Sequence, residues 1–148
     1  MSKFTIQKCT FEHLKEYGRI YAAAFSGEPW KDPWKAENAE IHVKEWLESK
    51  HFYGLEYSAD DKVIGFILGT AVLFAEGRTF MMQALAVDPE YQRQGIAKKL
   101  VTQCLADVKA MGMINSYLIT ANNDILPKFY SQFGFKPDEK ICMLGLKF

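Results

Sequence analysis

The feature that most constrains this chain is a nearly unbroken apolar run that stops abruptly and is followed by an amphipathic segment. Residues 81–87 are almost wholly apolar, which is typical of a strand covered on both faces of a sheet. Asp88 and Pro89 then end the strand and force a turn. Across residues 96–111 apolar side chains recur every three or four positions, and Gly112 follows as a left-handed stop. The sequence therefore predicts a buried strand, a tight turn and one helix in direct succession.

The turn between this strand and this helix has the features of an anion site. A helix start exposes unpaired N–H groups and a partial positive charge. Gly95 and Ala97 carry no bulk that would keep a phosphate away from these amides. Arg93, Lys98 and Lys99 surround the helix start, where a bound polyanion would offset their unfavourable interaction with the macrodipole. The alternative is that Gly95 only ends a loop and that the lysines are solvated, since so short a pattern also occurs by chance.

At 148 residues, about half of them hydrophobic (49%), the chain is expected to form one domain over residues 1–148. Lys plus Arg (18) equal Asp plus Glu (18), so no overall electrostatic field favours binding of nucleic acid or of an anionic membrane.

No apolar run reaches the length of a membrane span and no signal peptide opens the chain, so we expect a cytoplasmic protein. Three cysteines and three histidines lack disulfide or metal-ligand spacing, and no metal is expected. Neither G-x-x-x-x-G-K-[ST] nor G-x-G-x-x-G occurs, which argues against nucleoside triphosphates and dinucleotides.

Hydrophobic periodicity along the whole chain predicts an α/β (α+β) fold. The expected order is strand, two helices, three strands, helix, strand, helix, strand. Thr10 is expected to cap the first helix, which ends near Gly27. The expected strands cover residues 3–9, 52–58, 63–74, 79–87, 113–120 and 141–148, and the later helices cover residues 35–50, 96–111 and 125–133.

The loop after the first helix packs two tryptophans, two carboxylates and two prolines into eight positions. Aromatic faces and carboxylates both favour a cation, which makes Glu28, Trp30 and Trp34 candidate residues for binding an amine substrate. A structural interpretation is equally available, in which Asp32 and Pro33 form an N-cap and N1 pair for the next helix and the tryptophans close the core. Both interpretations remain open from the sequence.

Residues 85–100 resemble the cofactor motif of the GNAT superfamily of N-acetyltransferases. The superfamily pattern Arg/Gln-x-x-Gly-x-Gly/Ala is met here by Gln92, Gly95 and Ala97. The resemblance implies acetyl-coenzyme A (acetyl-CoA) as cofactor, with its pyrophosphate on the amides of residues 92–97 and its pantetheine arm along the preceding strand. The cofactor-binding residues implied in this way are Leu85, Ala86, Val87, Gln92, Arg93, Gln94, Gly95, Ile96, Ala97, Lys98, Asn123 and Tyr130.

A second resemblance to the same superfamily lies at residues 123–135. It follows the pattern Asn-x-x-Ala-x-x-Phe/Leu-Tyr-x-x-x-Gly-Phe, with Leu126 in place of the alanine. Together with the order of elements, the likeness covers roughly residues 4–148. It implies the GNAT acyl-CoA N-acyltransferase fold, in which a mixed, mostly antiparallel central sheet is flanked by about four helices.

Tyr130 is the expected general acid for the leaving thiolate. A phenol with a pKa of about 10 is protonated at neutral pH and can give its proton to a thiolate whose conjugate acid has a pKa of about 8.5. The alternative role of Tyr130 is that of an amphipathic core tyrosine. By the same resemblance Asn123 contacts the pantetheine arm, although it is also suited to cap the last helix, and the two roles can coexist.

The general base is unassigned. Many members of the superfamily carry a glutamate two residues before the position of Leu85, but this chain has Gln83, whose amide does not accept the proton of an amine usefully. The candidates are Glu28, Asp32, Glu45 and Glu76, a chain of water molecules, or no base at all for an amine of low pKa.

Taken together, these features predict an acetyl-CoA-dependent N-acetyltransferase that acts on the primary amine of a small molecule, such as a polyamine, an amino sugar or an amino acid. Direct transfer in a ternary complex is expected. The alternative is a non-catalytic acyl-CoA-binding sensor or partner protein, which the glutamine at position 83 favours. A nucleic-acid-binding role has little support. A homodimer formed through the end strands is left open.

Overall fold

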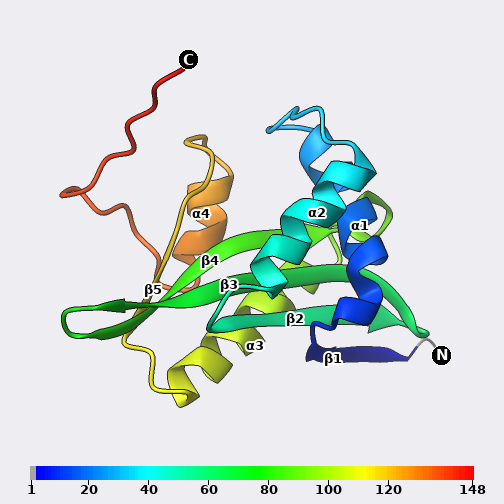
Figure 1. Ribbon diagram of the computed structural model, residues 1–148, viewed down its shortest axis with the longest axis horizontal. Coiled ribbons are helices and arrows are strands. Elements are labelled where there is room, and N and C mark those ends of the chain that lie inside the picture. The colour runs from blue at the N-terminus through cyan, green and yellow to red at the C-terminus, as the bar shows by residue number, and fades with distance from the viewer. Residues whose placement is uncertain (1–2) are drawn as a thin grey trace.

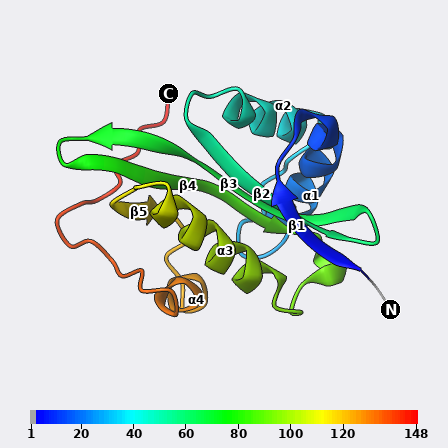
Figure 2. The same cartoon turned by 90° about the horizontal axis from the view of Figure 1, so that it is seen from below.

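The computed structural model describes residues 3–148 and contains a five-stranded sheet in the order β1-β2-β3-β4-β5, with helices on both faces (Figures 1 and 2). The strands are β1 (Phe4–Lys8), β2 (Phe52–Ala59), β3 (Lys62–Phe74), β4 (Gly77–Val87) and β5 (Asn115–Leu118). The helices are α1 (Leu14–Ser26), α2 (Ala36–Leu47), α3 (Ile96–Ala110) and α4 (Leu126–Ser131), with 3-10 turns at Phe11–His13 and Pro89–Tyr91. The predicted α/β fold with a mixed, mostly antiparallel sheet and four helices is confirmed.

The sheet separates two apolar clusters. One cluster packs α1 and α2 against one face, with Tyr17, Ile20 and Val43 completely buried. The other packs α3 against the opposite face, with Leu100 and Val101 completely buried. Figure 2 shows α1 and α2 on one side of the sheet and α3 and α4 on the other. Because both faces of β3 and β4 are covered, these strands have the nearly continuous apolar sequences seen in the chain. In the described part of the chain, no helix combines the length and apolarity needed to cross a membrane.

Strands β1 to β4 form an antiparallel meander, whereas β4 and β5 are parallel and are joined through α3. The parallel ladder is short, because it ends at the pair formed by Met82 and Leu118. Beyond that pair, β4 continues to Val87, and within residues 3–148 its only strand neighbour there is β3. The two parallel strands therefore diverge toward their carboxyl ends, and the freed edge of β4 is available to a ligand.

A β-bulge lies at the point where the strands diverge. Leu68 pairs with Ala84 and Gly69 pairs with Met82, so Gln83 has no partner on β3. Gly69 is required opposite the bulge, because a Cβ atom there would lie 2.3 Å from the carbonyl oxygen of Met81. The absence of a side chain at position 69 allows β3 to follow the bulged strand closely.

One expectation from the sequence, and one of the interpretations left open there, were wrong. Residues 141–148 form no strand and extend away from the sheet (Figure 1), and in the described chain they pair with no strand. Asp32 and Pro33 do not begin the second helix, which has Lys35 at its N-cap position. The backbone N–H of Asp32 donates instead to the carbonyl of Phe25 at 2.9 Å, which ties the loop back to the end of α1.

We expect Gly69→Ala to lower the free energy of unfolding by about 1–3 kcal/mol, because the added methyl group would overlap the Met81 carbonyl and the Phe80 ring. Urea denaturation measures the change. Gly27→Ala is the matched control, since the nearest atom to a Cβ at position 27 is 4.0 Å away and its φ of −89° suits alanine. Equal stability of the two variants would contradict the close approach at the bulge.

Candidate active site

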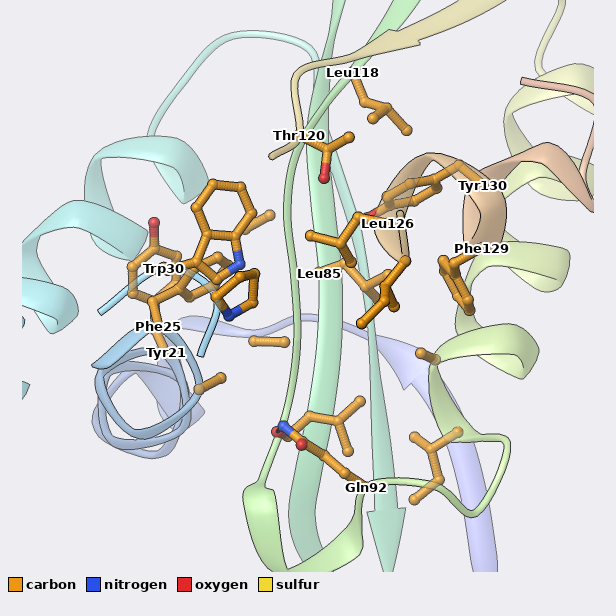
Figure 3. Close-up of a pocket in the computed structure, with 18 of the residues that line it drawn as sticks. Tyr21, Phe25, Trp30, Leu85, Gln92, Leu118, Thr120, Leu126, Phe129 and Tyr130 are labelled. Atoms are coloured by element: carbon orange, nitrogen blue, oxygen red, sulfur yellow. Dashed lines mark hydrogen bonds between the residues drawn. The ribbon is translucent and has the colours of Figure 1, made fainter. Parts of the chain in front are cut away.

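A cavity of about 620 Å³ opens where β4 and β5 diverge. Its walls come from the carboxyl halves of β4 and β5, the start of α3, helix α4 and the loop between α1 and α2. In Figure 3, Leu85 of β4 lies between an aromatic group containing Trp30 and a second group containing Tyr130. Twelve of the predicted site residues line this cavity, namely Glu28, Trp30, Leu85, Ala86, Val87, Gln92, Arg93, Gly95, Ile96, Ala97, Lys98 and Tyr130. Gln94, Asn123 and Trp34 are not part of the lining.

The turn after β4 is held by side chains of its own segment and of α1. The Asp88 carboxylate accepts a hydrogen bond from the backbone N–H of Glu90 at 3.1 Å and one from the Arg19 guanidinium at 3.0 Å. The side-chain amide of Gln92 donates to the carbonyl oxygen of Val87 at 3.0 Å. Gln92 thus closes the turn onto the end of the strand, a structural role that accompanies its place in the cavity wall.

The first turn of α3 presents its backbone to the cavity. Gly95 is the N-cap residue with φ +79°, and no side chain caps the helix. A Cβ at Gly95 would have no heavy atom within 4 Å, so the space in front of the first amides is open. No acidic residue lies in this first turn, while Lys98 lines the cavity. Unpaired N–H groups, open space and a nearby ammonium group together make a site for an anion.

Lys99 does not share this position. Its Nζ atom lies 5.9 Å from the centre of the Tyr57 ring, which is part of the cluster under α3, and Lys99 is absent from the cavity lining. The structure thus places Lys98 at the cavity and Lys99 over an aromatic face, and support of the anion by Lys99 stays a prediction.

The freed edge of β4 supplies a second kind of binding group. Gln83 to Val87 all line the cavity, and in this part β4 has a strand neighbour on one side only. Alternate N–H and C=O groups of such an edge point outward, where an extended ligand with amide groups can pair as an added strand. One of these carbonyls, that of Val87, already accepts the hydrogen bond from Gln92.

Tyr130 lies on α4, opposite the aromatic loop. Its ring contacts Phe129 and Phe135 edge to face, with ring centroids 5.0 and 5.9 Å away. Burial raises the pKa of Tyr130 to about 12, so the phenol is protonated at neutral pH. Among the described residues its hydroxyl has no hydrogen-bond partner, and Figure 3 shows the side chain directed toward Leu126 and the cavity. The hydroxyl is therefore available as a donor to a ligand.

Asn123 positions the helix that carries Tyr130. Its side-chain oxygen accepts hydrogen bonds from the backbone N–H groups of Ile125 at 2.9 Å and Leu126 at 2.8 Å. Asn123 lies two residues before the N-cap residue Ile125, and through these two contacts it satisfies N–H groups at the start of α4, which is the local role expected from the sequence. Contact between Asn123 and a pantetheine arm stays a prediction.

The two tryptophans of the loop have different surroundings. Trp30 packs on Phe25 with ring centroids 5.6 Å apart, and both line the cavity together with Tyr21. Trp34 instead packs edge to face on Tyr21 at 5.1 Å and against His42 at 5.0 Å, within the cluster of α1 and α2. Trp30 is thus placed to contact a ligand, and Trp34 supports the aromatic wall from behind.

Only two of the four candidate carboxylates reach the cavity, Glu28 and Asp32. Glu45 lines a separate small hollow, and Glu76 lies in the turn between β3 and β4 at the far end of the hairpin. Glu28 forms an ion pair with Lys31 at 2.8 Å, although both side chains are mostly exposed. Asp32 has no such cation partner among the described residues. Burial, and after it the charge of Asp32, raises the pKa of Tyr21, which places this carboxylate at the aromatic wall.

Several cavity residues were missed by sequence reasoning. They come from the end of β5 and the start of α4, and they are Leu118, Ile119, Thr120, Ile125, Leu126 and Phe129. A general rule could have predicted Leu118, Ile119 and Thr120 at the end of β5. In sheets with parallel strands, ligands bind beyond the carboxyl ends of the strands, at the point where neighbouring strands diverge. In the described part of the chain, no group of three or more His, Cys, Asp or Glu residues is arranged to hold a metal ion.

Comparison with known proteins identifies the class of protein. Residues 14–135 match the model of the Acetyltransferase (GNAT) family, so the chain belongs to this family and the resemblance seen in its motifs is confirmed. The prediction of an N-acetyltransferase is thereby confirmed at the level of the family.

Two relatives are named [Ribosomal protein bS18]-alanine N-acetyltransferase. The protein from Haemophilus ducreyi is 35% identical over 57% of this chain and 56% of its own length. The protein from Salmonella typhimurium is 29% identical over 69% of this chain and 71% of its own length. The chain thus matches little more than half of the first relative. Among solved structures, an aminoglycoside N-acetyltransferase in complex with CoA superposes with a TM-score of 0.76 at 18% identity, covering 99% of this chain and 97% of that one, which shows the shared fold.

We expect Gly95→Ala to weaken binding of coenzyme A about tenfold or more, equivalent to about 1.4 kcal/mol, because the methyl group would stand over the amides of the first turn of α3. Calorimetric titration measures the affinity. Gly112→Ala is a close control, since Gly112 also has a left-handed backbone (φ +94°) with open space at its Cβ but lies at the other end of α3. Both variants should lose similar stability, and similar losses of affinity would argue against the anion site.

Proposed function

We propose that this chain transfers the acetyl group of acetyl-CoA directly to the primary amine of a small molecule, of the polyamine, amino sugar or amino acid class. One observation carries the proposal. A single cavity brings together the open N-terminus of α3, the freed edge of β4 and the unpartnered hydroxyl of Tyr130. These are the parts needed to hold a diphosphate, an extended amide-containing arm and a departing thiolate.

The backbone would position the cofactor. The diphosphate would accept hydrogen bonds from the amides at the start of α3, with Lys98 adding charge. The pantetheine arm would lie along Leu85, Ala86 and Val87 as an added strand. One of these amides can also polarise the thioester carbonyl, where negative charge develops in the transition state. Holding the thioester in this way supplies most of the orientation that direct transfer needs.

Side chains would then donate and accept the protons that the reaction transfers. The neutral amine attacks the thioester carbon, the C–S bond breaks, and Tyr130 donates its proton to the leaving sulfur. The pKa of about 12 keeps the phenol protonated, and the burial that raises it also disfavours a free thiolate in the same cavity. The proton lost by the amine passes to Asp32, to Glu28 or to water, because Gln83 lines the cavity but offers only an amide.

The loop between α1 and α2 would receive the amine. Trp30 and Phe25 present aromatic faces, and Asp32 adds a carboxylate whose charge is not neutralised by a partner cation among the described residues. Both features attract an ammonium group. Asp32 is better placed than Glu28 for this purpose, because the ion pair with Lys31 already engages Glu28.

A second acceptor class has specific support. The two relatives named above are [Ribosomal protein bS18]-alanine N-acetyltransferases, which makes the N-terminal amine of a protein an alternative acceptor. The proposed direct transfer chemistry is the same for both acceptors. The non-catalytic acyl-CoA-binding protein remains the alternative of a different class, supported by the glutamine at position 83.

We expect the wild-type chain to release thiol from acetyl-CoA with at least one member of an amine panel made of polyamines, amino sugars, amino acids and a peptide that begins with alanine. A preference for the peptide would select the second acceptor class. Binding of CoA without turnover on any amine would favour the non-catalytic alternative and would overturn the proposal that the chain is an enzyme.

With the preferred amine, Asp32→Asn should raise KM about tenfold or more through the lost attraction for a cation, while Glu28→Gln should change KM less because Lys31 already balances Glu28. Steady-state kinetics at two salt concentrations measures both variants. If the two variants behave alike, or if Glu28→Gln has the larger effect, the assignment of Asp32 is wrong.

We expect Tyr130→Phe to lower kcat by about 10²-fold or more, the usual contribution of a general acid, and to leave the affinity for CoA within about twofold. Because burial raises the pKa of Tyr130 to about 12, kcat of the wild type should not fall with pH below about pH 11 through loss of this proton. Rate profiles for both proteins measure this. A loss of less than about tenfold would exclude the general acid role.

A further inference from the structure

The aromatic wall of the cavity is larger than an ammonium group needs. It consists of Tyr21, Phe25 and Trp30, which all line the cavity and lie together in Figure 3. The rings of Tyr21 and Phe25 are stacked with their centroids 4.4 Å apart, and the centroids of Phe25 and Trp30 are 5.6 Å apart. A cation interacts with a ring within roughly 6 Å of its centroid, so one ammonium group occupies only part of this surface. The rest is available to an apolar part of the ligand.

Hydrogen bonds of the backbone hold this wall in a fixed shape. The N–H of Lys31 donates to the carbonyl of Gly27 at 2.8 Å, and the N–H of Asp32 donates to the carbonyl of Phe25 at 2.9 Å. These two bonds tie the loop to the end of α1. The rings are therefore arranged before a ligand arrives, and an apolar group can bind to them with little loss of side-chain freedom.

Two exposed isoleucines line the cavity away from this wall. Ile119 follows β5 and Ile125 precedes α4, and each side chain is 73% exposed. In Figure 3 their sequence neighbours Thr120 and Leu126 lie toward Tyr130, on the other side from Trp30. Covering exposed apolar surface in a cavity favours binding. A ligand with an apolar body can thus contact apolar side chains on both sides.

The carboxylates on this side of the cavity suit a single ammonium group. Glu28 and Asp32 both line the cavity, but Glu28 already forms an ion pair with Lys31 at 2.8 Å. Within residues 3–148, Asp32 has no cation partner. A second or third ammonium group of a polyamine would find no further unpaired carboxylate at this wall. The charges therefore favour a monoamine.

The same charges disfavour a free amino acid. Its α-carboxylate would lie close to Asp32 and Glu28, which repel it. The cations of the described chain that line the cavity are Arg93 and Lys98, and both belong to the turn after β4 and the start of α3. They lie where the diphosphate is proposed to bind and leave the aromatic wall without a positive charge.

An amino sugar also fits this wall poorly. Each sugar hydroxyl that leaves water needs a hydrogen-bond partner in the protein. Apart from the two carboxylates, the aromatic wall offers only the hydroxyl of Tyr21 and the ring N–H of Trp30. These groups are too few for the several hydroxyls of a sugar.

We propose that the acceptor is a primary monoamine that is joined by a short aliphatic chain to an aromatic ring and carries no carboxylate. This inference rests on the proposed function, and it narrows the classes of small amine named there. The ammonium group would lie at Asp32, whose charge, after the effect of burial, raises the pKa of Tyr21 and which is therefore close to the wall. The ring would lie against Phe25 and Trp30. After the amine loses a proton, its nitrogen attacks the thioester carbon as described above.

Steady-state acetylation by the full-length chain at saturating acetyl-CoA tests the class. The probes are 2-phenylethylamine, 2-cyclohexylethylamine, ethylamine, spermidine, glucosamine and phenylalanine. We expect kcat/KM for 2-phenylethylamine to exceed the values for the last four amines by at least about tenfold, because only this amine combines one charge with a buried ring. It should exceed the value for 2-cyclohexylethylamine by about two- to tenfold, the contribution of an aromatic contact beyond its area.

The ratio of kcat/KM for 2-phenylethylamine to that for ethylamine reports the contact with the wall. Trp30→Ala should lower this ratio at least about fivefold, because the variant removes part of the surface that the ring covers. Trp46→Ala is the matched control, since Trp46 packs edge to face on His42 with ring centroids 6.3 Å apart and lines a separate hollow. Its ratio should equal that of the wild type. A Trp30→Ala variant in which both rates fall but the ratio is preserved would show a structural role only and would overturn the inference.

The remaining outcomes separate this inference from the proposed function. Turnover of spermidine, glucosamine, phenylalanine or a peptide that begins with phenylalanine at least as fast as turnover of 2-phenylethylamine would overturn the inference and leave acetyl transfer intact. Calorimetric titration of the same amines into the CoA-saturated chain gives a second measurement. Selective binding of 2-phenylethylamine without turnover of any amine would support the ligand class and overturn the proposed function. Absence of both binding and turnover would overturn both.

Discussion

The short parallel ladder between β4 and β5 is the constraint on which the rest of the structure depends. Its four residue pairs end at Met82 and Leu118, and beyond them one edge of β4 has no strand neighbour. Backbone N–H and C=O groups away from water need partners, so this edge accepts a ligand that can pair as a strand does. The crossover helix α3 begins beyond the end of the same strand and therefore presents its own unpaired amides to the same cavity. In the proposed function, one divergence of two strands would thus supply both kinds of binding group for an extended anionic cofactor.

A separate polar network, on the side of the sheet that α1 covers, holds the aromatic wall of the cavity in place. The buried carboxylate of Glu56 on β2 receives hydrogen bonds from the hydroxyl of Tyr17 and the amide of Gln7, and it lies 2.8 Å from the ring nitrogen Nδ1 of His13. A buried carboxylate is costly unless it is satisfied in this way. Because Tyr17 lies on α1, the network fixes that helix to the sheet. The aromatic loop that follows α1 consequently has a defined position beside the cavity.

Sequence patterns predicted the parts of this structure that depend on neighbours in the chain, and they failed where the outcome depends on distant partners. The bounds of α3 and the left-handed stop at Gly112 follow from local periodicity and glycine, and the structure confirms both. The turn around Gly95 was also predictable, because backbone geometry and small residues determine it. By contrast, the bulge at Gln83 requires Gly69 on another strand, and no local pattern reveals that pairing. The apolar pattern of residues 141–148 predicted a strand, but a strand also needs a neighbour with which to pair, and the local pattern does not reveal whether one is present.

The two sides of the cavity therefore differ in how well the sequence predicts them. The side proposed for the cofactor is built mainly from backbone amides and small residues, which is why a short motif predicts it. The side proposed for the acceptor amine is built from side chains of a loop, where Trp30 lines the cavity, Trp34 is packed behind it and Lys31 forms an ion pair with Glu28. Each of these roles depends on the rotamer and partner of one residue. In the proposed function, selectivity for the amine would rest on the few side chains that remain unpaired at the wall, and among the carboxylates that reach the cavity, Asp32 meets this condition.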